Sequence, residues 1–119
     1  MCRTLPALCV LLSACGIFGL DLDMTNRRLL DPIPAEYPRW YAEVESCLNE
    51  VGDFGAINWY VADRIEVSGL TAPGVWPEPN TIIILNTYVL DVSLVKHEMI
   101  HHILQKGGSI HDSPVFDCA

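Results

Sequence analysis

Three residues near the C-terminus have the types and spacing of a catalytic metal site: His97, Glu98 and His101. If this segment is an α-helix, residues four apart lie about one turn and roughly 40° apart, so the two imidazoles can converge on one zinc ion. Glu98, about 100° from His97, would face a water molecule in an open coordination position, as metal-assisted hydrolysis requires. The alternative is that both histidines are satisfied on a partly buried helix without a metal.

The flanking residues favour a helix within residues 93–107. An apolar stripe runs beside the histidine face and consists of Leu94, Ile100, Ile103 and Leu104. Asp91 or Ser93 can cap the first turn, because a short side-chain oxygen there accepts a hydrogen bond from a free backbone N–H. Gly107 and Gly108 predict the end of the helix.

A catalytic zinc usually has three protein ligands and leaves one position for water. His111 follows His101 by 10 residues, beyond the glycine turn, and is the preferred third ligand because imidazole suits zinc. Asp112 as third ligand, or a site with two histidines alone, is the alternative. His102 points about 100° away from His101, so we expect it to support or line the site without binding the ion.

The composition limits the class of protein. The chain of 119 residues has room for one domain, and 50% of its residues are hydrophobic, which is sufficient for a modest core. Its formal net charge is −8, and its 7 Lys and Arg residues are scattered. Because a nucleic-acid-binding surface needs clustered positive charge, we expect no nucleic-acid partner.

The N-terminus has the features of an export signal. Arg3 supplies a positive charge, and residues 5–14 form an apolar run that is too short to span a bilayer as a helix. We therefore expect a signal peptide over residues 1–14. An ordinary secretory signal cut nearby, or a signal retained on a soluble protein, is the alternative.

The end of this segment, Leu-Ser-Ala-Cys-Gly at residues 12–16, resembles the lipobox of bacterial lipoproteins. In those proteins the cysteine is acylated and becomes the first residue after cleavage. The resemblance implies that Cys15 is a lipid anchor. The polar, proline-containing composition of residues 15–36 predicts a tether, and partial packing of this segment through Leu29, Leu30 and Ile33 is the alternative. The protein would then be a bacterial membrane-anchored lipoprotein that faces the periplasm or the cell exterior.

Cysteine usage agrees with export. Cys2 and Cys9 would leave with the signal peptide. Lipidation would use Cys15, so Cys47 and Cys118 would remain in a compartment where disulfides form. We predict that this pair is bonded, and two separate buried thiols are the alternative. Closing a loop of about 70 residues would stabilise the fold by about 4 kcal/mol in the chain-entropy model.

Periodicity predicts the elements that must position the metal helix. Apolar residues at helical spacing predict an amphipathic helix over residues 37–51. Alternation of apolar and polar residues predicts one half-buried strand over residues 57–67, with Asp63 as the exception. Residues 81–85 form a continuous apolar and β-branched run, which predicts a strand covered on both faces.

Residues 69–80 are rich in turn-forming residues. Val75 and Trp76 are expected to form a short edge strand that ends at Pro77. Residues 37–119 should therefore form one α+β domain. It would contain a small mixed or antiparallel sheet, an N-terminal packing helix and the helix that carries the histidines.

The segment from His97 to Phe116, His-Glu-Met-Ile-His-His-Ile-Leu-Gln-Lys-Gly-Gly-Ser-Ile-His-Asp-Ser-Pro-Val-Phe, resembles the zincin metallopeptidases. It is distantly similar to the small SprT-like and WLM metalloproteases, which carry HExxH on a helix and a third histidine followed by a short segment ending in an aromatic residue. The longer metzincin signature is absent, since Leu104 stands in place of its glycine and Gly107 in place of its third histidine. No later glutamate helix of the thermolysin type follows, so the zincin subfamily stays open.

The resemblance implies a minimal zincin-like domain that uses Zn²⁺ to hydrolyse peptide bonds. Glu98 would take a proton from the attacking water and deliver it to the leaving amine. A donor for the oxyanion is also expected, and the candidates are Tyr60, Tyr88 and His102. The edge strand at Val75 and Trp76 would pair with an extended peptide or protein substrate.

Two other interpretations stay open. One is a zinc-containing binding or structural lipoprotein with no useful turnover, and the other is a zinc hydrolase that acts on something else, such as cell-wall peptide. Glu98 argues against a purely structural site, because such sites usually have four ligands and gain nothing from a carboxylate beside an open position. The sequence does not indicate an oligomeric state.

Overall fold

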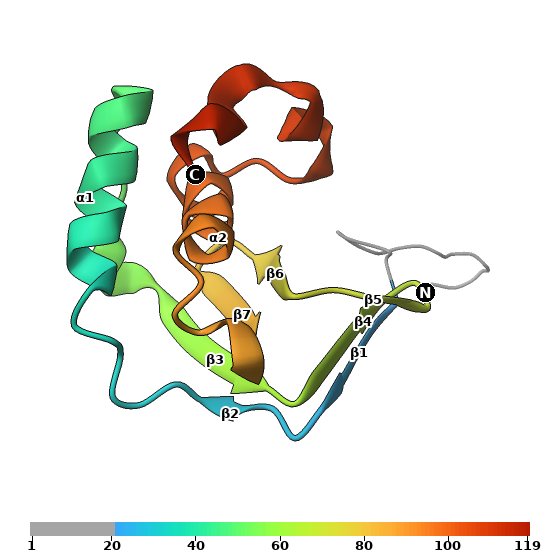
Figure 1. Cartoon of the computed structure of the whole chain (residues 1–119). Coiled ribbons are helices and arrows are strands. Elements are labelled where there is room, and N and C mark those ends of the chain that lie inside the picture. The colour runs from blue at the N-terminus through green and yellow to red at the C-terminus, as the bar shows by residue number, and fades with distance from the viewer. Residues whose placement is uncertain (1–20) are drawn as a thin grey trace.

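The computed structural model describes residues 21–119, which fold into two helices and two β-sheets (Figure 1). The expected α+β class is confirmed. The signal peptide expected over residues 1–14 and the lipidation expected at Cys15 lie outside the described residues. Within residues 21–119, no helix combines the length and the apolar character needed to span a membrane.

The larger sheet lies beneath the helices and is mixed. Its strands, in spatial order, are β2 (Arg28–Leu29), β3 (Asn58–Ala62), β7 (Thr81–Leu85) and β6 (Gly74–Glu78). The β3 and β7 strands are parallel, and the other two pairs are antiparallel. The expected double-sided burial of β7 is confirmed, because Ile82, Ile83 and Ile84 have no accessible surface.

The edge strand β6 is also confirmed, although it extends further than expected. It continues through Pro77 to Glu78, with a register shift between Val75 and Glu78. Proline is tolerated there because an edge strand needs backbone donors on one side only, and an irregularity absorbs the missing N–H.

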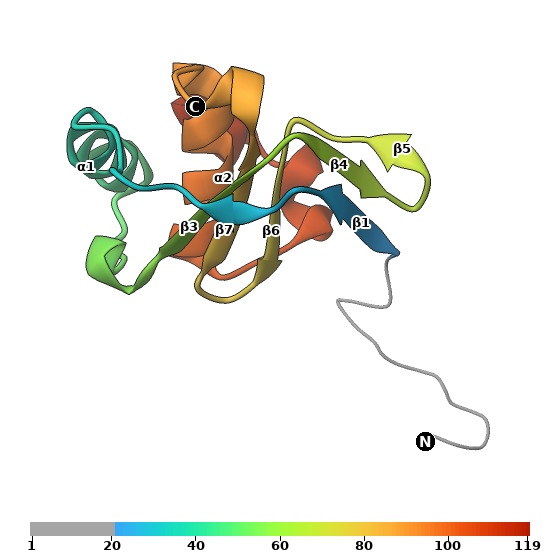
Figure 2. The ribbon, with the colours of Figure 1, turned by 90° about the horizontal axis from the view of Figure 1, so that it is seen from below.

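The smaller sheet is antiparallel and extends away from the helices (Figures 1 and 2). Its strands, in spatial order, are β1 (Leu22–Thr25), β4 (Arg64–Val67) and β5 (Leu70–Thr71). Residues 15–36 are therefore not a plain tether, because β1 and β2 lie within them and pair with later strands. Backbone hydrogen bonding to β3 and β4 places these largely exposed residues in the folded domain.

The single strand expected over residues 57–67 is wrong, because β3 and β4 belong to different sheets. The chain changes sheet at Asp63, the residue that broke the alternation. Its carboxylate accepts hydrogen bonds from Asn26, Arg28 and Asn86, and its backbone N–H donates to the Thr25 carbonyl. These hydrogen bonds, together with the ion pair to Arg28, lower the pKa of the Asp63 carboxyl. Polar contacts with distant residues therefore fix the corner.

The α1 helix (Tyr37–Leu48) is the expected packing helix. Its buried residues are Tyr37, Trp40, Tyr41 and Val44. The helix ends earlier than predicted, because Asn49 adopts a left-handed backbone conformation with φ of 55°. Val51 consequently leaves the apolar stripe and is 87% exposed.

The α2 helix (Val92–Leu104) carries the histidines and packs beside α1 on the same face of the larger sheet (Figures 1 and 2). Asp91 caps it by accepting a hydrogen bond from the Leu94 N–H at 3.1 Å. The predicted end at Gly107 is wrong, since Gln105 ends the helix with φ of 52°. The Gln105 side chain donates to the carbonyls of His102 and Pro79, so a contact with a distant loop fixes this end.

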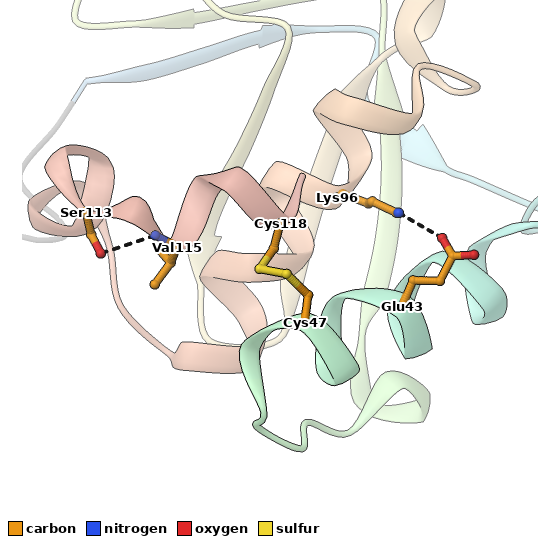
Figure 3. Close-up of a disulfide and its surroundings, with 6 residues drawn as sticks. All are labelled: Glu43, Cys47, Lys96, Ser113, Val115 and Cys118. Carbon is orange, nitrogen blue, oxygen red and sulfur yellow. Dashed lines mark hydrogen bonds and ion pairs between the residues drawn. A yellow bond between two sulfur atoms is a disulfide. The ribbon is translucent and has the colours of Figure 1, made fainter.

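The last residues form two 3₁₀ turns, η3 (Gly108–Asp112) and η4 (Pro114–Cys118). We call residues 108–119 the C-terminal clasp, because they fold back beside α2 (Figure 1). The predicted disulfide is confirmed: Cys47 on α1 is bonded to Cys118 on η4, with a sequence separation of 71 residues (Figure 3). An ion pair of 2.8 Å between Glu43 on α1 and Lys96 on α2 lies at the same helix interface.

Replacing Ile83 with Ala should lower the free energy of unfolding by about 2–5 kcal/mol, because the cavity lies in a fully enclosed strand. Val51→Ala is the matched control and should change it by less than about 0.5 kcal/mol, since the side chain is exposed. Urea unfolding followed by circular dichroism measures both. A large loss of stability in Val51→Ala would contradict the exposed position of Val51.

Candidate metal centre

Three histidines from two elements meet at the surface of α2. His97 and His101 lie one turn apart on the helix, and His111 comes from η3. The Nε2 atom of His111 lies 3.2 Å from that of His97 and 3.0 Å from that of His101. In the described part of the chain, these three residues form a group that could hold a metal ion, since their ligand atoms lie within 4.8 Å of one another.

These distances fit a shared metal ion. Two nitrogens that bind one zinc ion at 2.0–2.1 Å with tetrahedral angles are about 3.3 Å apart. The Nδ1–H of His101 donates to the Lys106 carbonyl at 2.8 Å, which leaves Nε2 of a neutral ring free to accept a proton or bind a metal. A single proton on the His111 Nε2 could satisfy only one of its two neighbours well. A cation between the rings satisfies all three.

Burial keeps two of these rings in the form that binds metals. Desolvation, with smaller contributions from His101 and His111, lowers the pKa of His97 to about 4. Burial also lowers the pKa of His101, although the hydrogen bond to the Lys106 carbonyl opposes this effect. Both imidazoles are therefore neutral at neutral pH, as metal ligation requires.

Two aromatic residues fix the orientation of the rings. Phe116 on η4 stacks on His97, with ring centroids 4.2 Å apart, and lies 5.3 Å from the centroids of both His101 and His111. Trp76 on β6 is stacked on His101, with an interplanar angle of 9° and a centroid distance of 6.0 Å. The indole N–H donates to the Pro79 carbonyl, which holds the Trp76 ring in this position.

Glu98 lies beside the histidines and is largely buried. Its side chain is close to Gly74 of β6, where a Cβ atom would come within 3.3 Å of both Cγ and Oε2 of Glu98. Glycine at position 74 therefore allows the edge strand to approach the carboxyl group closely. Glu98 is only 4% exposed, and burial raises its pKa to about 8.

The three histidines and Glu98 line one broad cleft of about 1460 Å³. The lining residues come from β6 with its flanking prolines and from α2 and the start of the clasp, and Leu22 and Val67 of the smaller sheet also line the cleft. Among the described residues that line it, none is Lys or Arg, and most are apolar. The volume exceeds the roughly 300–1,000 Å³ of ordinary small-molecule pockets, so the cleft has room for a longer ligand.

The other sequence candidates are separated by the structure. Asp112 is exposed and is not part of the histidine group. Tyr88 lines the cleft, whereas Tyr60 and His102 do not. Tyr60 instead lies beneath the Arg27 guanidinium, at 4.3 Å.

His102 is a structural histidine. Its Nδ1 accepts a hydrogen bond from the Tyr41 hydroxyl at 2.9 Å, and its Nε2–H donates to Oδ1 of Asn80 at 3.1 Å. With both ring nitrogens occupied, His102 cannot donate to an oxyanion in the cleft. These two hydrogen bonds connect α2 to α1 and to the loop before β7, so the supporting role expected for His102 is to hold α2 in place.

Three contributors to the site had no recognisable pattern in the sequence. They are the carbonyl of Lys106, the absence of a side chain at Gly74 and the indole of Trp76. A backbone carbonyl carries no residue-type signal, and the roles of the other two depend on how β6 lies along α2. Only the edge position of Trp76 was predictable.

His111→Ala should weaken zinc binding by more than about 100-fold, which is the upper range for loss of an outer-shell partner. Asp112→Ala removes a neighbouring polar side chain outside the histidine group and should bind zinc like the wild type. Titration calorimetry against a competing chelator measures both affinities. The opposite ranking would show that the carboxylate, and not His111, completes the site.

The candidate centre thus joins two neutral imidazoles on one helix, a third from the clasp, and a buried carboxyl group in a shared cleft. This donor set is suited to zinc, because three imidazoles leave a tetrahedral ion one open position. No protein-family model, curated protein or solved structure matches the chain.

Proposed function

We propose that this protein is a zinc-dependent metallopeptidase of the zincin type, in which His97, His101 and His111 bind the ion and Glu98 is the general base and acid. The observation that carries the proposal is the convergence of three imidazole Nε2 atoms in a cleft that also contains a buried glutamate. Zincin-like architecture is part of the proposal, supported by the HExxH helix, the third histidine and the edge strand beside them.

A catalytic site is favoured over a structural zinc site. Structural sites usually have four protein ligands, often cysteines. Here Cys47 and Cys118 are bonded to each other and cannot bind a metal. Three histidines would leave one position open on a tetrahedral ion, and these histidines line a cleft and not a packed core.

Glu98 has the environment of a proton carrier. A general base works best when its pKa lies near the working pH, and burial moves the pKa of this carboxyl upward from the ordinary range of a glutamate. When bound, zinc supplies a Lewis acid for the scissile carbonyl and a positive charge that makes nearby groups more acidic. The carboxyl group would accept a proton from the attacking water and return it to the leaving amine.

The cleft favours an extended peptide as substrate. Strand β6 is the edge of the larger sheet, and its outer side forms one wall of the cleft. A peptide in extended conformation can hydrogen-bond to such an edge while its side chains contact the apolar walls. Tyr88, the candidate that lines the cleft, is the proposed donor to the oxyanion.

We also propose that the protein is exported and held at a bacterial membrane through lipid on Cys15. The disulfide between Cys47 and Cys118 supports export, because such bonds persist mainly outside the cytosol. The lipobox-like segment before Cys15 supports the anchor.

Glu98→Gln should retain zinc and lose hydrolysis of a mixed peptide library by about 10²–10⁴-fold, because the amide cannot accept the proton. Glu78→Gln is the matched control, since Glu78 lines the same cleft but is exposed at the end of β6. Zinc content by elemental analysis and cleavage by mass spectrometry are the two measurements.

A Glu98→Gln variant that cleaves as fast as the wild type would remove Glu98 from the mechanism. A wild type that holds zinc but cleaves no peptide would instead favour the zinc-containing binding lipoprotein. Cleavage of cell-wall peptides alone would favour the third interpretation, a zinc hydrolase with another substrate.

For the anchor, the full chain expressed in a bacterium should partition into the detergent phase, and Cys15→Ser should move it to the aqueous phase because the acyl chains are lost. Cys9→Ser is the control, since it removes a neighbouring cysteine that is not the expected acceptor. Phase partition followed by immunoblotting measures this. Unchanged partition of the Cys15 variant would reject lipidation.

A further inference from the structure

The C-terminal clasp supplies two of the side chains that build the metal centre. His111 provides the third Nε2 atom, and Phe116 contacts all three imidazole rings. Both come from 3₁₀ turns that lie beside α2, and neither belongs to a regular helix or strand. The geometry of the centre therefore depends on what holds this irregular segment in place.

Few directional contacts hold the clasp to the described part of the domain. The backbone hydrogen bonds of residues 110–119 are with residues 107–119, and the Ser113 hydroxyl accepts from the Val115 N–H in the same segment (Figure 3). Within residues 21–119, neither Asp112 nor Asp117 forms an ion pair. What remains is apolar packing by residues such as Ile110 and Val115, the histidine contacts and one covalent bond.

The disulfide lies close in sequence to Phe116, which contacts the three imidazole rings. Cys118 is on the same 3₁₀ turn as Phe116, two positions away, and its partner Cys47 is on the rigid α1 helix. Tyr41 and Val44 bury α1 in the core, so the disulfide joins the clasp to a fixed part of the domain. Figure 3 shows the bond bridging α1 and η4.

We propose that the disulfide between Cys47 and Cys118 positions the third ligand, so that the metal affinity of the centre depends on this bond. The proposal rests on the metal site proposed above and assigns a role in it to two residues that do not touch the ion. With the bond intact, the clasp is fixed at both ends, by α2 before it and by α1 through Cys118. With the bond broken, only the chain through Gly107, the contacts of His111 and apolar packing retain it.

The bond should raise the metal affinity because it restricts the conformations of the clasp before the ion binds. A third ligand on a free chain end must be ordered each time the ion binds, and that ordering reduces the affinity. A cross-link near the ligand removes those alternative conformations in advance. Since Phe116 would move with Cys118, loss of the bond would also loosen the stacking that orients His97.

Coupling of this kind acts in both directions. If the disulfide raises the affinity for zinc, zinc must stabilise the clasp around the disulfide by the same factor. Zinc should therefore shift the equilibrium between the disulfide and the dithiol toward the disulfide. In a glutathione buffer, reduction breaks the S–S bond of the protein, joins two glutathione molecules in a disulfide and leaves their two thiol protons on the two cysteines.

The first experiment is a zinc titration of the double variant Cys47→Ser and Cys118→Ser against a competing chelator. Serines avoid the complication that reduced thiols bind zinc themselves. We expect affinity about 10–100-fold below that of the wild type, in the range found when a supporting partner of a ligand is lost. Far-UV circular dichroism at the titration temperature verifies that the variant is folded.

Glu43→Gln is the matched control. It breaks the ion pair with Lys96 at the same helix interface without touching the clasp, so it should leave zinc affinity unchanged (Figure 3). Equal affinities for the wild type and the serine variant would overturn the positioning role while leaving the metal site intact. A wild type that binds no zinc would overturn the metal site and this proposal together. Equal losses in control and variant would also overturn the role, because general loosening would explain both.

The second experiment does not depend on the folding of the serine variant. The wild type and His111→Ala are equilibrated in mixtures of reduced and oxidised glutathione, with and without zinc, and free thiols are counted by mass spectrometry after alkylation. We expect zinc to make the disulfide several-fold harder to reduce at equilibrium in the wild type and not in His111→Ala. An identical equilibrium with and without zinc in the wild type would overturn the proposal.

Discussion

The site depends on the rotation of α2 about its own axis. Val95, Met99 and Ile100 are fully buried and contact the sheet and α1, so they fix which side of the helix faces the core. With these residues inward, His97, Glu98 and His101 lie along the cleft. A rotation of α2 by one residue, about 100°, would expose an apolar side chain and withdraw a ligand. Burial of these three apolar side chains thus directs His97 and His101 toward the cleft, although none of the three belongs to the histidine group.

The polar groups on α2 divide according to how they are satisfied. His102 has partners for both ring nitrogens, and His101 donates one N–H to a carbonyl, which fixes its orientation. Glu98 is about as buried as these residues, but no hydrogen bond joins its carboxyl group to another described residue, and it lines the cleft. Buried carboxyl groups that line a cleft occur where chemistry requires them. The hydrogen-bond partners of His102 mark it as a structural residue, whereas the lack of such partners for Glu98 is consistent with its proposed catalytic role.

A small domain can hold an irregular segment accurately if a covalent bond supplements its core. The apolar core between the helices and the sheet is modest, and the clasp covers one edge of it with 3₁₀ turns in place of a longer helix. The disulfide joins this segment to α1 across 71 residues. Disulfides of this kind persist mainly in oxidising compartments, which is consistent with the proposed export. By the proposal above, the same bond contributes to both stability and site geometry.

Local periodicity and residue chemistry were sufficient to predict several features of the protein. The two helices, the buried strand β7, the edge position of Trp76, the cysteine pair and the three converging histidines all followed from spacing or residue type. Such signals are local or belong to few residues, so they do not require knowledge of the fold. The oxyanion donor was left open among three candidates, because periodicity does not say which side chains from different elements face one cleft.

Other features depend on contacts between residues far apart in the chain and are visible only in the folded protein. Such contacts determine the change of sheet at Asp63, the pairing of β1 and β2, and the end of α2 at Gln105. In each sheet, and at the end of α2, residues far apart in the chain supply the deciding hydrogen bonds. The approach of Gly74 to Glu98 and the stacking of Trp76 on His101 likewise exist only once β6 lies along α2. Residue spacing therefore identified the candidate metal ligands. Their surroundings could not be predicted, because the environment of a side chain depends on the elements that pack against it.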